Sequence, residues 1–168
     1  MIDHVCGRIL ELKPRSVLDI GVGFGKFGFL AREYTDVWNG DYFDWKARID
    51  GIEIFERYVG TLQRLVYDNI YIGDAVEVID KLGVYDLVIC SDMLEHLEKD
   101  RGMELLGKIG DHARFAIVAL PVYPSDQGDV YGNEHERHRA NWAFRELNEF
   151  GLVSIKETAF MLEMKGKE

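Results

Sequence analysis

One segment constrains the fold of this chain more than any other: the sequence VLDIGVGFG at residues 17–25, which joins an apolar strand to a helix through glycines. Glycine lets a backbone turn tightly and approach a ligand where a Cβ would clash, and the first N–H groups of a helix are free to bind that ligand. After the turn, Phe27, Leu30, Ala31 and Tyr34 recur at helical spacing. The segment therefore predicts a strand–turn–helix unit that binds a nucleotide.

Apolar runs and helical patterns alternate along the chain after this unit. We expect strands at 49–54, 70–72, 85–90 and 115–120, and helices at 58–66, 75–82 and 101–109. In the first of these helices, the residues expected to face inward are Tyr58, Val59, Leu62, Leu65 and Val66. Strands that alternate with helices are typical of a parallel sheet covered on both faces.

The two ends of the chain have patterns of their own. Residues 1–13 predict a short amphipathic helix rather than a signal peptide. Near the other end, Asn141 is expected to cap a helix at 142–150, and 152–165 hold two strand-like runs so close that they must be antiparallel. We therefore predict an α/β fold: a doubly wound, mostly parallel Rossmann-like sheet of about seven strands with a C-terminal antiparallel strand pair and helices on both faces.

Composition limits the classes of function. A chain of 168 residues fits a single domain, 1–168, and leaves no room for a separate catalytic domain. Its formal net charge of -10 argues against nucleic acid and favours a small-molecule or glycan substrate. Two cysteines form no disulfide framework, and no apolar run is long enough for a membrane span, so we expect a cytoplasmic protein that does not bind membranes.

Two long irregular stretches are expected at 35–48 and 122–139, and such loops are usually functional or mobile. The first carries Trp38, Tyr42, Phe43 and Trp45. We interpret these aromatic residues as a packed surface loop or a self-association patch, such as a homodimer contact, in preference to a wall for an apolar or sugar-like substrate.

Three acidic residues are placed at or near the ends of successive strands. Asp19 lies inside the first strand and needs a polar partner, either loop N–H groups or the ammonium group of a ligand. Glu53 ends the second strand, where a carboxylate can accept hydrogen bonds from ribose hydroxyls, although it could instead complement the next helix dipole. Asp74 follows the third strand and could accept from an adenine amino group or cap the next helix.

A GxGxxG pattern at residues 23–28 keeps a nicotinamide or flavin site open as an alternative. In a dinucleotide site the glycines would begin directly at the strand end, whereas here Gly21 and Val22 come first. The chain is also too short for a hydride-acceptor domain. Gly28 is better explained by close packing of the helix on the sheet.

Four motifs in order resemble the class I S-adenosylmethionine-dependent methyltransferases of the small single-domain type. They are Asp19 with its glycines, Glu53, Gly73-Asp74-Ala75 and the segment YDLVICSDMLEHL at 85–97. The resemblance covers almost the whole chain and implies S-adenosyl-L-methionine as methyl donor and S-adenosyl-L-homocysteine (SAH) as product. The cofactor-binding residues that it implies are Asp19, Gly21, Gly23, Gly25, Glu53, Ile54, Asp74, Ala75, Asp92 and Met93.

Within this resemblance, the glycines and Asp19 would line the methionine part of the cofactor, Glu53 the ribose and Asp74 the adenine. The acceptor would be a hydroxyl or amine of a small molecule or glycan. A general base is needed only if the acceptor must lose a proton, and histidine titrates in the useful range. The candidate catalytic residues are His96, His138 and Asp92, with His135 close by in the sequence.

The spacing Asp92-x-x-Glu95-His96 with a later His138 is also similar to metal-assisted O-methyltransferases that act on small-RNA ends, and partly to ubiquinone-pathway O-methyltransferases. Those families have Glu where this chain has Asp92. Because Leu-Glu-His after this strand is widespread in methyltransferases without a metal, we assign no metal ligand from the sequence. A methyltransferase-like partner module that binds the cofactor weakly is a further alternative, against which intact Asp19 and Glu53 speak.

Overall fold

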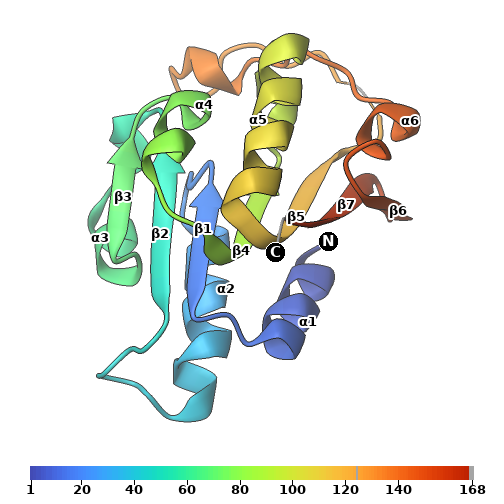
Figure 1. Ribbon diagram of the computed structural model, residues 1–168. Coiled ribbons are helices and arrows are strands. Elements are labelled where there is room, and N and C mark those ends of the chain that lie inside the picture. Colours follow the sequence, from blue (N-terminus) through green and yellow to red (C-terminus); the bar gives the residue numbers. More distant parts are fainter. Residues whose placement is uncertain (124, 167–168) are drawn as a thin grey trace.

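The computed structural model describes residues 1–123 and 125–166, and its centre is a seven-stranded sheet in the order β3-β2-β1-β4-β5-β7-β6 (Figure 1). The strands are β1 (Ser16–Ile20), β2 (Arg48–Glu53), β3 (Asn69–Ile72), β4 (Tyr85–Ser91), β5 (Ala113–Pro121), β6 (Leu152–Lys156) and β7 (Ala159–Lys165). The first five pair in parallel, and β7 runs antiparallel to both β5 and β6. This arrangement confirms the predicted sheet and its closing strand pair.

Helices cover both faces of the sheet (Figure 1). They are α1 (Ile2–Leu12), α2 (Lys26–Thr35), α3 (Thr61–Val66), α4 (Ala75–Val78), α5 (Lys99–His112) and α6 (Phe144–Leu147). Short 3-10 turns are η1 (Val37–Asn39), η2 (Glu56–Tyr58), η3 (Ile79–Lys81), η4 (Leu94–His96) and η5 (Glu134–Glu136). One apolar cluster packs α1 and α2 on the sheet, and a second packs α4, α5 and α6 on the other face.

The predicted helix at 142–150 is wrong in both length and start, because α6 spans only Phe144–Leu147 and Ala143, not Asn141, precedes it. The cause is Trp142, whose indole is buried against α5. A Cβ on Gly102 would lie 2.5 Å from Trp142 Cζ2, so the ring fills the space that glycine leaves. Trp142 Nε1 also donates to the Leu94 carbonyl at 3.4 Å. Packing of this side chain therefore outweighs the helical pattern.

The helix after β2 is also shorter than predicted and is rotated. Leu62 and Leu65 were expected to face inward, but both are exposed. Val59 and Val66 are buried as expected, and Gln63 is buried in place of the two leucines, because α3 has fewer than two turns and presents only one narrow side to the sheet. The apolar spacing therefore predicted the existence of this helix but only part of the side that it buries.

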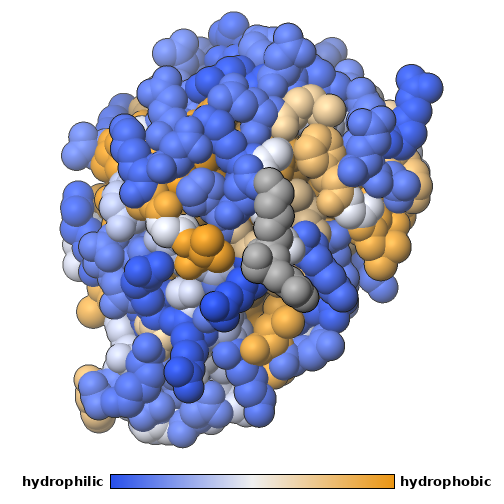
Figure 2. All heavy atoms as spheres, viewed as in Figure 1, coloured by the Kyte–Doolittle hydropathy of each residue, from blue (hydrophilic) through white to orange (hydrophobic). Residues whose placement is uncertain are grey.

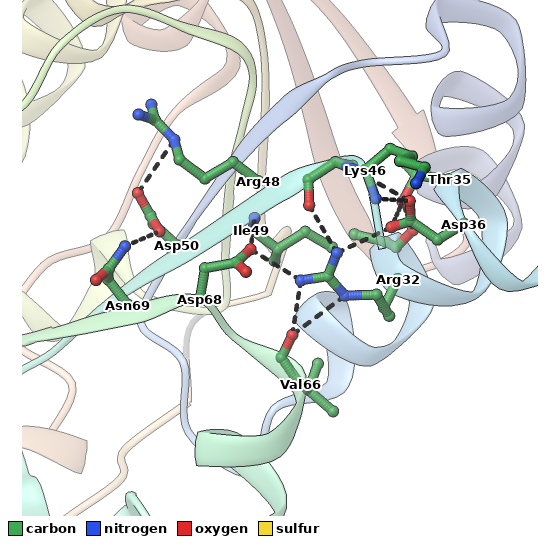
Figure 3. Close-up of polar contacts among 12 residues, drawn as sticks. Arg32, Thr35, Asp36, Lys46, Arg48, Ile49, Asp50, Val66, Asp68 and Asn69 are labelled. Carbon is green, nitrogen blue, oxygen red and sulfur yellow. Dashed lines mark hydrogen bonds and ion pairs between the residues drawn. The ribbon is translucent and has the colours of Figure 1, made fainter. Parts of the chain in front are cut away.

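A buried arginine fixes the loop between α2 and β2 (Figure 3). Arg32 donates to the Ala47 carbonyl at 2.7 Å, pairs with Asp36 at 2.9 Å and lies under the Trp45 ring at 4.3 Å from its centroid. The loop leads into the start of β2, at the end of the sheet opposite its carboxyl edge (Figure 1). Only Trp45 is packed in the way expected, because Trp38, Tyr42 and Phe43 are exposed. The loop lies away from the carboxyl edge of the sheet.

The face of the molecule shown in Figure 2 is mostly hydrophilic, with hydrophobic residues in small separate groups. Among the helices of residues 1–123 and 125–166, none combines the length and the apolar character needed to cross a bilayer.

Candidate functional site

One cavity, which we call the main cavity because predicted site residues line it, opens at the carboxyl ends of β1 to β4, where the turns after these strands meet the segment at 122–139. We call this segment the strap; the structure describes all of it except residue 124. Eight of the residues predicted to bind a cofactor line the cavity: Gly21, Gly23, Glu53, Ile54, Asp74, Ala75, Asp92 and Met93. A crevice at the carboxyl edge, beside the point where the strand order reverses, is where sheets of this topology bind ligands. The cavity is therefore our candidate site.

The turn at residues 21–25, which we call the glycine loop, shows why glycine is needed there. Gly21, Gly23 and Gly25 have φ angles of 82°, 50° and 84°, in the left-handed region that side chains with a Cβ rarely adopt. Gly23 is held at both of its polar groups. Its N–H donates to Glu53 Oε2 at 2.8 Å, and its carbonyl accepts from Gln63 Nε2 at 3.1 Å. The loop is thus a fixed structure.

Glu53 is buried at the end of β2 and faces the cavity. One carboxylate oxygen accepts from Gly23 N, and the other accepts from Phe55 N at 2.8 Å. Burial raises the pKa of Glu53, while these two N–H groups oppose that shift. Because each carboxylate oxygen has two lone pairs, Glu53 keeps acceptor capacity for ligand hydroxyls.

Asp19 does not line the cavity, and neither does Gly25. The Asp19 side chain is 2% exposed and accepts a hydrogen bond from the Tyr67 hydroxyl at 2.6 Å. Burial raises the pKa of Asp19 to about 7. The polar partner that the sequence demanded therefore exists, but it is a tyrosine hydroxyl that sequence analysis did not anticipate.

Asp74 lines the cavity and also caps the helix that follows it. Its Oδ1 accepts from Val76 N at 2.8 Å, and its Oδ2 pairs with Arg101 at 2.9 Å. The capping role considered from the sequence is thus present. The carboxylate is fixed at the cavity edge by α4 on one side and α5 on the other.

Asp92 follows β4 with a φ of 52°, an unusual angle for a residue with a Cβ. Its Oδ2 accepts from Ser91 Oγ at 3.0 Å and lies 3.8 Å from Lys26 Nζ. About half of its side chain is exposed. The strained backbone directs this carboxylate to the cavity, and such strain is typical of functional sites.

Two of the predicted catalytic residues lie together, and the third lies apart. The ring centroids of His96 and His138 are 5.0 Å apart. Glu95 lies beside them, and one possible metal-ligand atom from each of the three residues lies within 4.8 Å of the other two. Asp92 is not part of this cluster. His96 lines the main cavity, whereas Glu95 and His138 line a smaller one beside it.

Glu95 is buried, and its Oε2 accepts no hydrogen bond from any residue that the structure describes. Burial raises the pKa of Glu95 to about 8 and lowers that of His96. His138 Nδ1 lies 2.8 Å from the Ser125 carbonyl, which orients the ring and leaves Nε2 available. A buried carboxyl oxygen without a hydrogen-bond donor is destabilising, so Glu95 Oε2 is a candidate metal ligand or proton acceptor.

The strap supplies site residues that sequence analysis did not single out. Asn133 and Glu136 line the cavity, as does Tyr58 from η2, whose hydroxyl donates to Glu136 Oε1 at 2.9 Å. Phe24 of the glycine loop packs on Tyr58, with ring centroids 5.1 Å apart. In the sequence, only the length of the strap and its histidines indicated a functional role. Contacts between segments distant in the sequence produce no local sequence pattern, so Asn133, Glu136 and Tyr58 could not be identified.

Comparisons with known proteins agree on the fold. No protein-family model and no curated protein matches the chain. Among solved structures, TehB from Haemophilus influenzae superposes with a TM-score of 0.71 at 13% identity, over 98% of this chain and 62% of TehB. The chain therefore spans less than two thirds of that relative.

Two further structures are similar over nearly the whole chain. Magnesium protoporphyrin IX methyltransferase (ChlM) from Synechocystis PCC 6803, solved with bound SAH, has a TM-score of 0.67 at 16% identity and is covered over 82% of its length, with 99% of this chain. The methyltransferase domain of bacterial CtHen1-C has a TM-score of 0.63 at 17% identity, with 97% and 99% coverage. The chain thus has the class I S-adenosylmethionine-dependent methyltransferase fold.

Proposed function

We propose that the chain is an S-adenosylmethionine-dependent methyltransferase whose acceptor is a hydroxyl or amine of a small molecule or glycan. The observation that carries the proposal is the cavity at the carboxyl ends of β1 to β4, lined by eight residues that the sequence motifs had marked for the cofactor. Glu53 lies at the end of β2, where its carboxylate would accept hydrogen bonds from the hydroxyls of a ribose.

The charges of the cavity suit this donor. S-adenosylmethionine supplies an electrophilic methyl group on a cationic sulfonium centre. Four carboxyl groups line the cavity, and no lysine or arginine among the described residues does. These are Glu53, Asp74, Asp92 and Glu136. An acidic, partly enclosed cavity attracts a cation more strongly than bulk water does.

His96 is the best placed proton acceptor. It lines the cavity, and burial lowers its pKa, which keeps the imidazole neutral at pH 7 and able to take a proton. His138 would act beside it, and Asp92 would orient the reactants. Most of the rate enhancement would come from alignment of donor and acceptor, since methyl transfer is an in-line displacement.

Isothermal titration with SAH tests the proposal. The unmodified protein should bind SAH, and Glu53→Ala should weaken binding by about tenfold or more, which corresponds to loss of one hydrogen bond to a charged group. His96→Ala is the control, because it should leave SAH affinity within a factor of about two while it lowers turnover. Binding of reduced nicotinamide dinucleotide in place of SAH would contradict the proposal.

A second candidate function is metal-assisted O-methylation, favoured by the cluster of Glu95, His96 and His138. The unpartnered Glu95 Oε2 fits a cation ligand, and oxygen and imidazole donors together suit Mg²⁺ or Mn²⁺. Such an ion would lower the pKa of an acceptor hydroxyl. The three side chains would hold it at the boundary between the two cavities.

Direct titration with Mn²⁺, followed by electron paramagnetic resonance, separates the two candidates. Metal-assisted transfer requires saturable binding that Glu95→Gln removes, because the amide carries no charge. Asp80→Asn, on the surface beside Lys108 and away from the cluster, is a control of the same chemical change. A signal equal in the unmodified protein and both variants would rule out this second function.

A further inference from the structure

Gln63 of α3 and Tyr67, the residue that follows this helix, contact the glycine loop from the side away from the cavity. Gln63 and Tyr67 are each only 5% exposed, and neither lines the cavity. The apolar spacing of this segment indicates only a packing role for α3. The contacts that Gln63 and Tyr67 make indicate a role in the candidate site.

The Tyr67 hydroxyl connects β1 to the start of α2. It donates to Asp19 Oδ2 at 2.6 Å and accepts from Gly28 N at 3.1 Å. Asp19 belongs to the strand that leads into the glycine loop, and Gly28 to the helix that follows the loop. One hydroxyl thus fixes the two ends of the loop relative to each other.

Glycine is required at positions next to these two side chains, because a Cβ there would contact them. A Cβ on Gly28 would lie 2.0 Å from Tyr67 Cζ. A Cβ on Gly25 would lie 3.4 Å from Gln63 Cγ. The last glycine of the GxGxxG pattern is therefore required by the Tyr67 ring, a more specific reason than the helix-on-sheet packing expected from the sequence.

Gln63 acts on the middle of the loop. Its amide nitrogen donates to the Gly23 carbonyl, while Glu53 accepts from the N–H of the same residue. Gly23 lines the cavity, so side chains of β2 and α3 together fix the peptide groups that a ligand would meet. Gln63 is itself held, because its Oε1 accepts from Gly60 N at 3.1 Å.

We infer that Gln63 and Tyr67 are positioning residues that hold the glycine loop in its ligand-binding shape, and that Asp19 acts on the ligand through the Tyr67 hydroxyl rather than by direct contact. The inference rests on the proposed function, since the ligand is taken to be S-adenosylmethionine or SAH. It differs from the expectation that Asp19 meets the ammonium group of the cofactor.

The chain contains a matched control for this arrangement. Tyr85 is as deeply buried as Tyr67, and its hydroxyl donates to the buried carboxylate of Asp50 at the same distance, 2.6 Å. Neither residue lines the cavity or touches the glycine loop. Tyr85→Phe therefore removes a hydroxyl from a tyrosine–aspartate pair, as Tyr67→Phe does, without a change at the glycine loop or the cavity.

The test is SAH affinity, measured by isothermal titration on a small set of variants. Tyr67→Phe and Asp19→Ala should each weaken SAH binding about tenfold, and the double variant should be no weaker than the worse single one, because both break one link. Asp19→Asn should retain affinity within about threefold, since its side-chain carbonyl still accepts from Tyr67. Tyr85→Phe should bind as the unmodified protein does.

The opposite pattern overturns the inference. If Asp19→Asn binds as weakly as Asp19→Ala while Tyr67→Phe binds normally, Asp19 meets the ligand by its charge. Asp19→Asn and Tyr67→Phe both conserve volume, so the comparison stands even if Asp19→Ala does not fold. Additive losses in the double variant would also contradict a single shared link.

A ligand-free measurement separates this inference from the proposed function. Amide hydrogen exchange of residues 23–25 should be faster in Tyr67→Phe and in Gln63→Met than in the unmodified protein, and unchanged in Tyr85→Phe. If the unmodified protein bound no SAH, the proposed function would fail, and these exchange rates would still decide whether the two side chains hold the loop. Unchanged exchange in both loop variants would refute the positioning role.

Discussion

Two buried tyrosine–aspartate pairs lie on opposite faces of one sheet, and their surroundings differ. Tyr67 packs in the cluster beneath α1 and α2, while Tyr85 packs in the cluster beneath α4 and α5. Asp50, the partner of Tyr85, also accepts from Asn69 Nδ2 at 2.9 Å and lies 3.4 Å from Arg48 Nε (Figure 3). Asp19, the partner of Tyr67, has no cation within ion-pair distance among the described residues.

The difference shows how one interaction serves two purposes. At Asp50 the buried carboxylate has one ion-pair partner, Arg48, and accepts hydrogen bonds from the Asn69 amide and the Tyr85 hydroxyl, as a stable core requires. At Asp19 only neutral donors are present, and burial raises the pKa to about 7. A buried carboxyl of this kind is destabilising unless it holds another group in place, and the group that it reaches through Tyr67 is the Gly28 N–H of α2, the helix that follows the glycine loop.

The largest expected effect is on the pH dependence of stability. The folded-state pKa of Asp19, about 7, lies above its ordinary value of 3.8, so its contribution is fully present below about pH 4 and is lost as the pH rises to 7. The unfolding free energy of the unmodified protein should therefore fall relative to that of Asp19→Asn by about 1.4 kcal/mol per pH unit in this window.

Urea unfolding of both proteins between pH 4 and 8 measures this difference. Glu53 and Lys26 are the charged groups whose fields reach Asp19, and its hydrogen-bond donors are the Tyr67 hydroxyl and the Gly28 N–H. These groups are the same in both proteins, so the titration of Glu53 and Lys26 largely cancels in the comparison. Parallel stability curves would show that Asp19 is ionised throughout, as Asp19 would be if a cation were present beside it.

The next largest effect should follow from Gly28→Ala. The new Cβ would lie 2.0 Å from Tyr67 Cζ, and displacement of this ring from a packed core should cost about 3 kcal/mol of unfolding free energy. Gly107→Ala is the control, because a Cβ on this exposed glycine of α5 meets nothing within 4 Å and should stabilise the helix by about 0.5–1 kcal/mol. Thermal unfolding measures both, and equal changes at the two positions would contradict the account of Gly28.

The smallest expected effect is the difference in unfolding free energy between variants of the two tyrosines. Tyr67→Phe should lower the unfolding free energy by about 2 kcal/mol, because it leaves the Gly28 N–H and the Asp19 carboxyl without their shared partner. Tyr85→Phe should cost about 1 kcal/mol, since Asp50 keeps Asn69 and Arg48. Chemical denaturation at pH 7 gives both values. A larger loss at Tyr85 would reverse the comparison.

Most of the fold could be predicted from the sequence because its signals are local. Buried parallel strands appear as continuous apolar runs, and the antiparallel pair follows from two runs with almost no connection, β6 and β7. The errors came where one side chain decided the local structure. Trp142 lies outside the helix predicted for it because its ring fills the space next to Gly102. In α3, Gln63 is buried in place of Leu62.

The sequence predicted only those site residues that lie at the ends of strands. Glu53 and Asp74 line the cavity because the ends of parallel strands meet at one edge. The partner of Asp19 was not predictable, since 48 residues separate it from Tyr67 and no short pattern records their contact. The strap was recognised as a long loop, but its Tyr58–Glu136 contact depends on the tertiary fold.

The position of β7 has a consequence for synthesis on the ribosome. The last strand in the sequence lies inside the sheet, between β5 and β6, and pairs with β5 along seven residues. Until residues 159–165 leave the exit tunnel, the nascent chain exposes an unpaired, apolar edge along β5. The sheet therefore cannot be completed in the order in which it is made, and the growing chain is most open to aggregation just before its last strand appears.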